Sequence, residues 1–340
     1  MKKLRIVALV DVDLMPPARA RAKEVLTAPW RTEYDVVQTL SRLGHEVHVL
    51  GVGGELNPIR RAMRAYRPHV FFNLLESFDD VRLWDQNVVG YLEMLKMKYT
   101  GCNSRGLLLA RDKALAKKLL SYHRIPVAEF AVARRGRKFR RPRKLAFPLF
   151  VKSLSLDASI GIAQASVVDS DEKLAERVRF VHDSVGTDAL VESYIEGREL
   201  TVGLLGNHRL TALPIWELTF EKMPESWHKI ATERLKFSPS YQEKHGILSG
   251  RAVDLPPGLE KRIQEIGRRV FRVLYLNGYA RIDLRVTDAG KVYVVEANPN
   301  PQIAHGEDFA ESALAAGLDY GPLLQRIVDL GIAWEPLTAA

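Results

Sequence analysis

Two carboxylates near the C-terminal end of the chain, Asp283 and Glu296, have the residue type and spacing needed to bind a cation together. They lie in two runs, residues 279–287 and 291–298, in which polar and apolar side chains alternate as in half-buried strands. A turn signal that ends in Gly290 joins the two runs. We therefore expect a β-hairpin with one carboxylate on each strand.

The register of this hairpin decides which side chains meet. If residues 289–290 form the tip, Asp283 faces Glu296 and Arg281 faces Asn298, and all four share one face of the sheet. The opposite face is then apolar, with Ile282, Leu284, Val286, Val295 and Ala297. A bulged three-residue tip would break this register.

Two opposed carboxylates in a mainly apolar sheet are destabilising unless a cation lies between them. Together with the amide oxygen of Asn298 they would form an all-oxygen ligand set, which suits Mg²⁺ shared with substrate phosphates. The alternative is a salt-bridge cluster in which Arg281 and Arg285 neutralise Asp283 and Glu296 without a metal. The hairpin alone leaves both arrangements open.

A second candidate site follows an apolar run at residues 147–152 that ends in Lys152. The next residues, 153–161, are mostly small or hydroxyl-bearing, and their amides and hydroxyls could close over a polyphosphate. The sequence contains no Walker loop, no dinucleotide-binding fingerprint and no nucleophile elbow. The loop therefore belongs to none of these common nucleotide or hydrolase motifs.

The elements that must position these groups begin with a strand and helix alternation, which predicts a parallel βαβαβ sheet. Its strands are expected at residues 4–10, 46–51 and 69–75, and one of its helices at residues 32–43. Ligands of such sheets bind at the carboxyl ends of the strands, where Asp11, Asp13 and Glu76 lie.

The rest of the chain predicts mixed elements. Asp112 is typical of a helix cap, before a helix at residues 113–122. A small α+β module follows, with strands at residues 147–152 and 161–166 and a helix at residues 171–182. A strand-rich stretch is expected at residues 190–216, and a long amphipathic helix at residues 258–276. The polar, irregular stretch at residues 220–250 is long for a structureless loop, as functional lids are.

Composition excludes several classes of protein. The 340 residues are 46% hydrophobic and 27% charged, which predicts a soluble globular protein of two or three domains. No apolar run is long enough to span a membrane, and the N-terminal run is a strand rather than a signal peptide. Cys102 is the only cysteine, which excludes an intrachain disulfide, and we expect a cytoplasmic protein.

The net charge of +9 arises mainly from residues 134–144, which hold eight basic residues and no acid. The remainder of the chain is nearly neutral. The run is interpreted as a solvated loop or hairpin tip between two strands, with an anchor for a phosphate-bearing partner as the alternative. Because one Phe is too little aromatic interleaving for base stacking, we do not expect a nucleic-acid partner.

Four segments, at residues 92–120, 148–163, 190–207 and 278–301, together resemble the ATP-grasp superfamily and, within it, the D-alanine–D-alanine ligase-like carboxylate–amine ligases. The resemblance implies an α/β ATP-grasp fold in three parts. These are an N-terminal parallel-sheet domain (1–105), a central α+β subdomain (106–191) and a C-terminal α+β subdomain (192–335) with the metal site and a closing loop.

The resemblance also implies roles for individual residues. ATP would be bound by Lys113 and Lys152 at the phosphates, Glu192, Tyr194 and Ile195 at the adenine hinge, Glu199 at the ribose and Val295 at the purine. Asp283, Glu296 and Asn298 would hold the metal ions, which would be Mg²⁺ or, in place of Mg²⁺, Mn²⁺. The implied catalytic residues are Arg281 beside the metal site, Lys236 on the closing loop and Ser159 in the phosphate loop.

The implied reaction is ADP-forming C–N ligation on an amino acid or small peptide. A carboxylate attacks the γ-phosphoryl group to give an acyl phosphate, and an amine then displaces phosphate. The alternative is an ATP-binding scaffold that has lost ligation and uses its basic run to hold an acidic partner. We expect small-molecule carboxylate and amine substrates and no membrane partner, and the sequence leaves open whether the chain forms a homodimer.

Three departures from the D-alanine-specific ligases bear on the substrate. Their Gly/Ser-rich segment with a glutamate is replaced after the first strand by residues 11–16 (DVDLMP), and their Gly-Ser-Ser run by Asp157-Ala158-Ser159. The segment after the metal asparagine reads Pro-Asn-Pro-Gln. The substrate residues are therefore predicted from position alone, as Asp13, Glu76, Asn300 and Gln302, and the use of D-alanine stays open.

Overall fold

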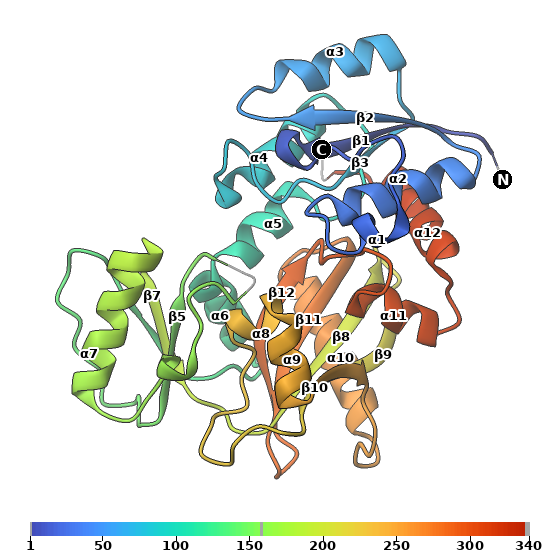
Figure 1. The fold of residues 1–340 in the computed structure, drawn as a ribbon. Coiled ribbons are helices and arrows are strands. Elements are labelled where there is room, and N and C mark those ends of the chain that lie inside the picture. The colour runs from blue at the N-terminus through green and yellow to red at the C-terminus, as the bar shows by residue number, and fades with distance from the viewer. Residues whose placement is uncertain (1, 157–158, 337–340) are drawn as a thin grey trace.

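The strands of the computed structural model form three sheets within residues 2–156 and 159–336, the part of the chain that the structure describes (Figure 1). The first sheet is parallel, in the order β2-β1-β3, as the βαβαβ pattern predicted. Its elements are β1 (Arg5–Asp11), α1 (Ala22–Val25), α2 (Arg31–Arg42), β2 (Glu46–Val52), α3 (Asn57–Tyr66) and β3 (Val70–Asn73). Short 3-10 turns (Val12–Leu14 and Arg82–Trp84), α4 (Asp85–Met94) and α5 (Ser104–Arg111) complete this part.

The second sheet has the order β4-β7-β5-β6, and its strand pairs are antiparallel. It is built from β4 (Phe130–Ala133), β5 (Leu149–Ser153), β6 (Val167–Val168) and β7 (Ala189–Ser193), with α6 (Lys113–Tyr122) and α7 (Asp171–Phe180). Asp112 caps α6 as predicted, because its side chain accepts from the backbone N–H groups of Ala114 and Leu115. A π-turn (Val181–Val185) extends α7 to Gly186.

The prediction of a strand at residues 161–166 is wrong. A turn and a 3-10 helix (Gln164–Ser166) occupy this segment instead. The Oγ of Ser166 accepts from the backbone N–H of Ala163 at 3.1 Å and from Nη2 of Arg177 at 2.8 Å, and the same Nη2 donates to the carbonyl of Gly161. These side-chain bonds replace a strand ladder and hold the segment in a turn.

The basic run at residues 134–144 is an exposed loop between β4 and β5. It is not a hairpin tip, because β7 lies between the two strands in the sheet. Arg141 stacks on Phe147 and pairs with Asp171 at 2.7 Å, and Lys144 pairs with Glu129 at 2.8 Å. The solvated-loop interpretation therefore describes its structure.

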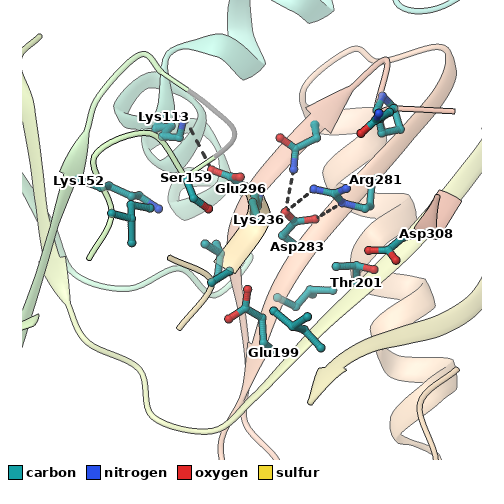
Figure 2. A pocket seen from close by; sticks show the side chains of 18 of the residues that line it. Lys113, Lys152, Ser159, Glu199, Thr201, Lys236, Arg281, Asp283, Glu296 and Asp308 are labelled. Atoms are coloured by element: carbon teal, nitrogen blue, oxygen red, sulfur yellow. Dashed lines mark hydrogen bonds and ion pairs between the residues drawn. The ribbon is translucent and has the colours of Figure 1, made fainter. Parts of the chain in front are cut away.

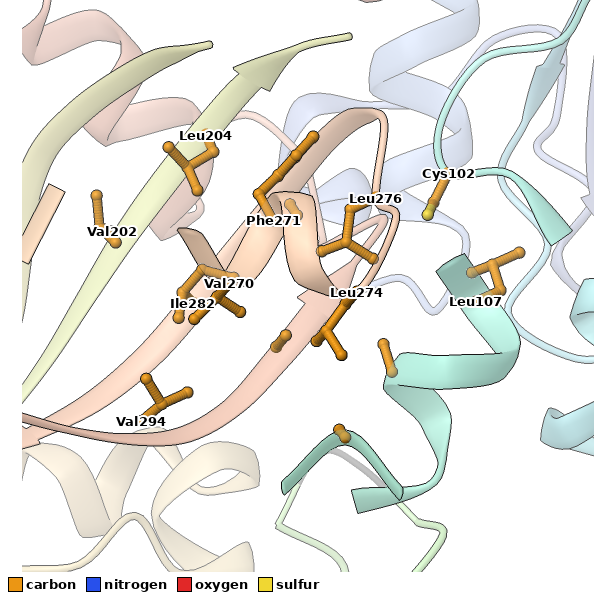
Figure 3. Close-up of a cluster of buried hydrophobic side chains, with 14 of the residues drawn as sticks. Cys102, Leu107, Val202, Leu204, Val270, Phe271, Leu274, Leu276, Ile282 and Val294 are labelled. Atoms are coloured by element: carbon orange, nitrogen blue, oxygen red, sulfur yellow. The ribbon is translucent and has the colours of Figure 1, made fainter. Parts of the chain in front are cut away.

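The third sheet is antiparallel, in the order β10-β9-β8-β11-β12. Its strands are β8 (Arg198–Gly206), β9 (Thr211–Phe220), β10 (Ile247–Arg251), β11 (Gly278–Val286) and β12 (Val292–Pro299). The predicted long helix, α10 (Leu259–Val273), buries Val270 and Phe271 against Val202 and Ile282 of this sheet (Figure 3). Helices α11 (Asp308–Ala315) and α12 (Tyr320–Ala333) follow, and Leu323 and Ile327 of α12 share a core with Val36 and Leu40 of α2.

The stretch at residues 220–250, expected to be irregular, contains α8 (Glu233–Phe237), α9 (Pro239–His245) and β10. Thr232 caps α8 and Ser238 caps α9, each through its hydroxyl. Leu235, Tyr241 and Ile247 then form a small buried cluster of their own. Among the helices that the structure describes, none is long and apolar enough to cross a membrane.

Candidate active site

A cavity of about 530 Å³ lies where the three sheets meet, and the first sheet, α6, β5 and the face of β11 and β12 all contribute to its walls. Every predicted site residue except Asp13 lines this cavity. They are Glu76, Lys113, Lys152, Ser159, Glu192, Tyr194, Ile195, Glu199, Lys236, Arg281, Asp283, Val295, Glu296, Asn298, Asn300 and Gln302. Figure 2 shows Lys113, Lys152 and Ser159 on one side and Arg281 and Asp283 on the other. The cavity thus brings together predicted residues from six separate segments of the chain.

The hairpin register is as predicted at the functional pair, where Asp283 faces Glu296 and Arg281 faces Asn298. The tip, however, holds three residues, because Thr287 pairs with Lys291. A bulge at Val295 compensates for the extra tip residue, since β11 passes from Asp283 to Leu284 while β12 passes from Glu296 to Val294.

The bulge corrects the predicted position of Val295. This residue was expected on the apolar face with Ala297, but it is half-buried and lines the cavity. Val294 instead enters the core, with 1% exposure, and its backbone N–H donates to the carbonyl of Pro126 at 2.9 Å. Val295 and Glu296 therefore both border the cavity, although they are successive residues of β12.

The carboxylate of Asp283 is held on three sides. Nε and Nη2 of Arg281 donate to its two oxygens at 2.7 and 3.0 Å, and Nδ2 of Asn298 donates to Oδ2 at 2.9 Å. Burial opposes the guanidinium charge of Arg281, but Asp283 outweighs this effect and raises the pKa of Arg281. The salt-bridge arrangement considered for the hairpin is therefore realised at Asp283.

Glu296 lies beside a different cation. Nζ of Lys113 is 3.8 Å from Oε2 of Glu296 and donates to the carbonyl of Leu156 at 2.9 Å. Lys113 is the first residue of α6 and is buried, so the helix cap at Asp112 fixes its position. One lysine thus connects the carboxylate face of β12 to the loop after β5.

Arg285 does not join the carboxylate pair, contrary to one of the two predicted arrangements. It is paired in the sheet with Glu199 of β8, and its Nη2 donates to Oε2 of Glu199 at 2.7 Å. The same guanidinium donates to the carbonyls of Gly197 at 3.0 Å and Lys229 at 2.6 Å. Its partner is therefore set by the neighbouring strand rather than by the hairpin.

Glu192 is the centre of a buried charge cluster that the sequence analysis missed. Its Oε1 lies 3.0 Å from Nζ of Lys152, and its Oε2 lies 2.8 Å from Nζ of Lys117. Burial opposes the carboxylate charge, but the two lysines outweigh it and lower the pKa of Glu192 to about 2. Lys117 is one helical turn after Lys113, so its position on the same face was visible in the sequence.

The two lysines differ in how well their charge is compensated. Burial also opposes the charge of Lys152, but the carboxylates of Glu192, Glu296 and Asp283 raise its pKa. Burial lowers the pKa of Lys117, and Glu192 offsets this effect only in part. Lys152 is consequently the more firmly charged of the two.

The segment between β7 and β8 borders the cavity at Tyr194 and Ile195. Gly197 in this segment has φ +142°, and an added Cβ would lie 2.1 Å from the carbonyl oxygen of Val286. Only glycine therefore fits where this segment passes the end of β11.

Lys236 lies on α8, is exposed, and borders the cavity. The segment that carries it contacts the loop after β5, because Oε2 of Glu233 accepts from the N–H of Gly161 at 2.7 Å. His228 and Gln164 exchange two further hydrogen bonds of 2.9 Å each. Ser159 of the same loop has φ +59°, while Asp157 and Ala158 lie outside the described residues.

The predicted substrate residues are less well placed. Asp13, predicted as a substrate residue, is exposed and lies outside the cavity lining, apart from the other three predicted substrate residues. Oδ1 of Asn300 accepts from the N–H of Cys102 at 2.7 Å, which ties this side chain to the backbone. Gln302 and Glu76 are at the cavity wall, and Nε2 of Gln302 is 3.5 Å from Oγ1 of Thr32.

Glu33 is a cavity residue that the sequence analysis did not single out. It lies in the first turn of α2, is 4% exposed, and lines the cavity. A signal was present, because Glu33 has helical spacing to the buried Val36 and Leu40. An acidic residue on the apolar face of a helix calls for a functional or structural explanation.

Comparisons with known proteins agree with this geometry. Residues 119–329 match the family model described as the D-ala D-ala ligase C-terminus. The chain is 31% identical to a D-alanine–D-alanine ligase of Syntrophotalea carbinolica over 304 residues, covering 88% of this chain and 89% of the relative. It is also 31% identical to the corresponding ligase of Desulfotalea psychrophila, covering 73% and 74%. The crystal structure of the D-alanine–D-alanine ligase from Bacillus anthracis complexed with ATP has the same fold, with a TM-score of 0.72 and 22% identity over 97% of both chains.

Proposed function

Because the chain belongs to the D-alanine–D-alanine ligase family of ATP-grasp enzymes and is thus an ATP-dependent carboxylate–amine ligase, we propose that it acts on an amino acid or small peptide through an acyl phosphate. The observation that carries the proposal is the meeting of Lys113 and Lys152 with the Asp283–Glu296 pair in one cavity. We do not assign D-alanine as the substrate. Residues 11–16 depart from the pattern of the D-alanine-specific ligases, and Asp13 of this segment lies outside the cavity.

The nucleotide would lie between the second and third sheets. Lys113 and Lys152 would bind its phosphates as compact point charges, and both are buried at the cavity wall. The remaining contacts are the backbone at Tyr194 and Ile195 for the adenine edge, Glu199 for the ribose, and Val295 for the purine face. Glu192 would act by holding Lys152 through its 3.0 Å ion pair.

The residues on β11 and β12 fit a divalent cation by their donor chemistry. Asp283 and Glu296 face each other, and Asn298 is the next residue on the same face. Among the described residues no three His, Cys, Asp or Glu side chains gather, so further ligands would come from the amide and from phosphate oxygens. Mg²⁺, or Mn²⁺ in its place, would be held by Asp283, Glu296 and Asn298 and would neutralise negative charge on the phosphates.

The chain's own residues would then favour each bond change. A substrate carboxylate oxygen attacks the γ-phosphorus and ADP leaves, while Arg281 stabilises negative charge beside Asp283. The amine nitrogen next attacks the acyl carbon, and phosphate leaves with the former carboxylate oxygen. The segment around Lys236 would exclude water, since an acyl phosphate hydrolyses readily.

We also propose that the chain divides into units at residues 1–105, 106–191 and 192–335. Sheet membership supports a division close to the second boundary, but slightly later in the chain, because β7 of the second sheet ends at Ser193 and β8 of the third sheet begins at Arg198. An ATP-binding scaffold without ligation is not favoured, because family membership and the intact set of cavity residues both point to catalysis.

The test is ADP release from ATP and Mg²⁺ across a panel of amino acids and dipeptides, with mass spectrometry of the products. Asp283→Asn and Glu296→Gln should abolish Mg²⁺-dependent turnover while the protein remains folded. Asp288→Asn, at the exposed tip of the same hairpin, is the matched control and should change nothing. If Asp283 served only its pair with Arg281, its loss would cost about 3–5 kcal/mol of stability and leave turnover per folded molecule intact.

A further inference from the structure

Two segments that are far apart in the sequence meet at the wall of the cavity. Ile160 and Ile162, in the loop after β5, line the cavity, and so do Ile230 and Ala231, in the segment that leads into α8. Ile230 is only 3% exposed, so this meeting point is closely packed. What holds the two segments together therefore decides whether this wall stays closed.

Four hydrogen bonds join the two segments, and we call them the clasp. Nε2 of Gln164 donates to the carbonyl of His228, and the backbone N–H of His228 donates to Oε1 of Gln164, both at 2.9 Å. The N–H of Gly161 donates to Oε2 of Glu233 at 2.7 Å, and the N–H of Glu233 donates to the carbonyl of Ile162 at 3.0 Å. Three of the four bonds thus depend on the side chain of Gln164 or Glu233.

The clasp connects segments that are anchored to different sheets. Arg177 of α7 donates to the carbonyl of Gly161, and α7 packs on the second sheet. Nη2 of Arg285, on β11 of the third sheet, donates to the carbonyl of Lys229 at 2.6 Å. The clasp is therefore a tie between the second and third sheets, in addition to the covalent connection through residues 194–197.

The two side chains of the clasp are placed to hold the segments rather than to touch a ligand. Among the described residues that line the cavity, neither Gln164 nor Glu233 is included. Gln164 is half-buried and Glu233 is exposed, so water can take the place of their bonds when the segments separate. The bonds therefore favour the closed arrangement without being required for folding.

We propose that Gln164 and Glu233 are positioning residues that keep the two segments together over the bound nucleotide and so set how long ATP and the acyl phosphate are retained. The proposal rests on the proposed function, because Ser159 belongs to one segment and Lys236 follows the other on α8. Separation of the segments would move both groups away from the phosphates and admit water.

The first test measures nucleotide retention without an amino-acid substrate. Radiolabelled ATP bound with Mg²⁺ is chased with excess unlabelled ATP, and its dissociation is followed by rapid filtration. Gln164→Ala removes two bonds of the clasp and Glu233→Ala removes one, so we expect each variant to release ATP at least about fivefold faster than the wild-type protein. Unchanged dissociation in both variants would overturn the proposal.

Two further variants make this test specific to the clasp. Glu233→Gln keeps a side-chain oxygen that can accept from the N–H of Gly161, so it should release ATP within about twofold of the wild-type rate. Glu243→Ala, at an exposed side chain of α9, is the matched control and should also stay within about twofold. Release from Glu243→Ala as fast as from Glu233→Ala would indicate general loosening of this stretch and would refute the assignment.

A stability measurement separates positioning from a structural role. Because Gln164 and Glu233 both reach solvent, we expect their alanine variants to melt within about 3 °C of the wild-type protein. A larger fall in melting temperature with an unchanged rate of ATP release would assign the two side chains a structural role and reject the proposal.

The last test keeps the clasp separable from the proposed function. ADP and ligated product are counted together with saturating substrates. An acyl phosphate that meets water hydrolyses, so the two alanine variants should release at least about three ADP per product where the wild-type protein releases about one. A ratio that stays at one in both variants would contradict the proposal. If the wild-type protein forms no ligated product, the proposed function fails, and the rate of ATP release alone then supports or overturns the clasp.

Discussion

The buried cluster of Glu192, Lys117 and Lys152 allows a quantitative prediction for Glu192→Gln. Lowering the pKa of Glu192 from its ordinary 4.5 to about 2 corresponds to about 3 kcal/mol of stability at pH 7, at 1.36 kcal/mol per pKa unit. Removing one member of a buried ion pair costs about 3–5 kcal/mol in other proteins, which agrees. We therefore expect Glu192→Gln to lower the free energy of unfolding by about 3 kcal/mol at neutral pH.

The pH dependence follows from the sign of this shift. Because the pKa of Glu192 is depressed in the folded state, its stabilisation is complete above about pH 4.5 and is lost as the pH falls toward 2. The difference between wild type and Glu192→Gln should thus shrink to roughly half at pH 3. Lys117, whose pKa burial already lowers, should lose its proton in the variant more readily than Lys152.

The assay is urea denaturation followed by tryptophan fluorescence at several pH values. Glu129→Gln is the matched control, because the Glu129–Lys144 pair has the same 2.8 Å separation as Glu192–Lys117 but both side chains are 61% exposed. We expect the control to lose at most about 1 kcal/mol. A loss in Glu192→Gln no larger than in Glu129→Gln, or one that does not shrink in acid, would refute the reasoning.

Two further predictions concern the cavity's surroundings. Lys236→Ala should lower kcat by at least about tenfold, which is about 1.4 kcal/mol of activation free energy, with ATP affinity nearly unchanged. Lys244→Ala, at an exposed lysine, should have no effect. A larger loss in Lys244→Ala would assign the role of the closing lysine to Lys244. Replacing the eight basic residues of 134–144 with Ser and Gln should leave turnover on a small substrate within about threefold. A loss that high salt reproduces in the parent protein would instead indicate an anionic ligand docked on this loop.

The hairpin shows what sequence periodicity can predict. The pairing of Asp283 with Glu296 was predicted correctly, although the assumed two-residue tip is wrong. The extra tip residue and the bulge at Val295 cancel, and alternation alone reveals neither of them. The predicted orientation of Val295 therefore failed while that of the carboxylates held.

Long-range partners limited the rest of the prediction. Lys117 was visible one turn after Lys113, but its partner Glu192 lies on a strand 75 residues away. Strand 161–166 failed because Arg177 on a later helix fixes the segment as a turn. In the stretch at residues 220–250, capping residues and apolar spacing were present, but the helical segments are short. Only the buried cluster that includes Tyr241 makes these helices stable.

The central claim, ligation through an acyl phosphate, is tested most directly by isotope transfer. The carboxylate substrate is labelled with ¹⁸O at both oxygens and incubated with ATP, Mg²⁺ and the amine, and the released phosphate is analysed by mass spectrometry. Because the attacking carboxylate oxygen leaves with the phosphoryl group, we expect ADP and inorganic phosphate that carries one ¹⁸O atom per C–N bond formed. Product formation with unlabelled phosphate, or with AMP in place of ADP, would contradict this mechanism.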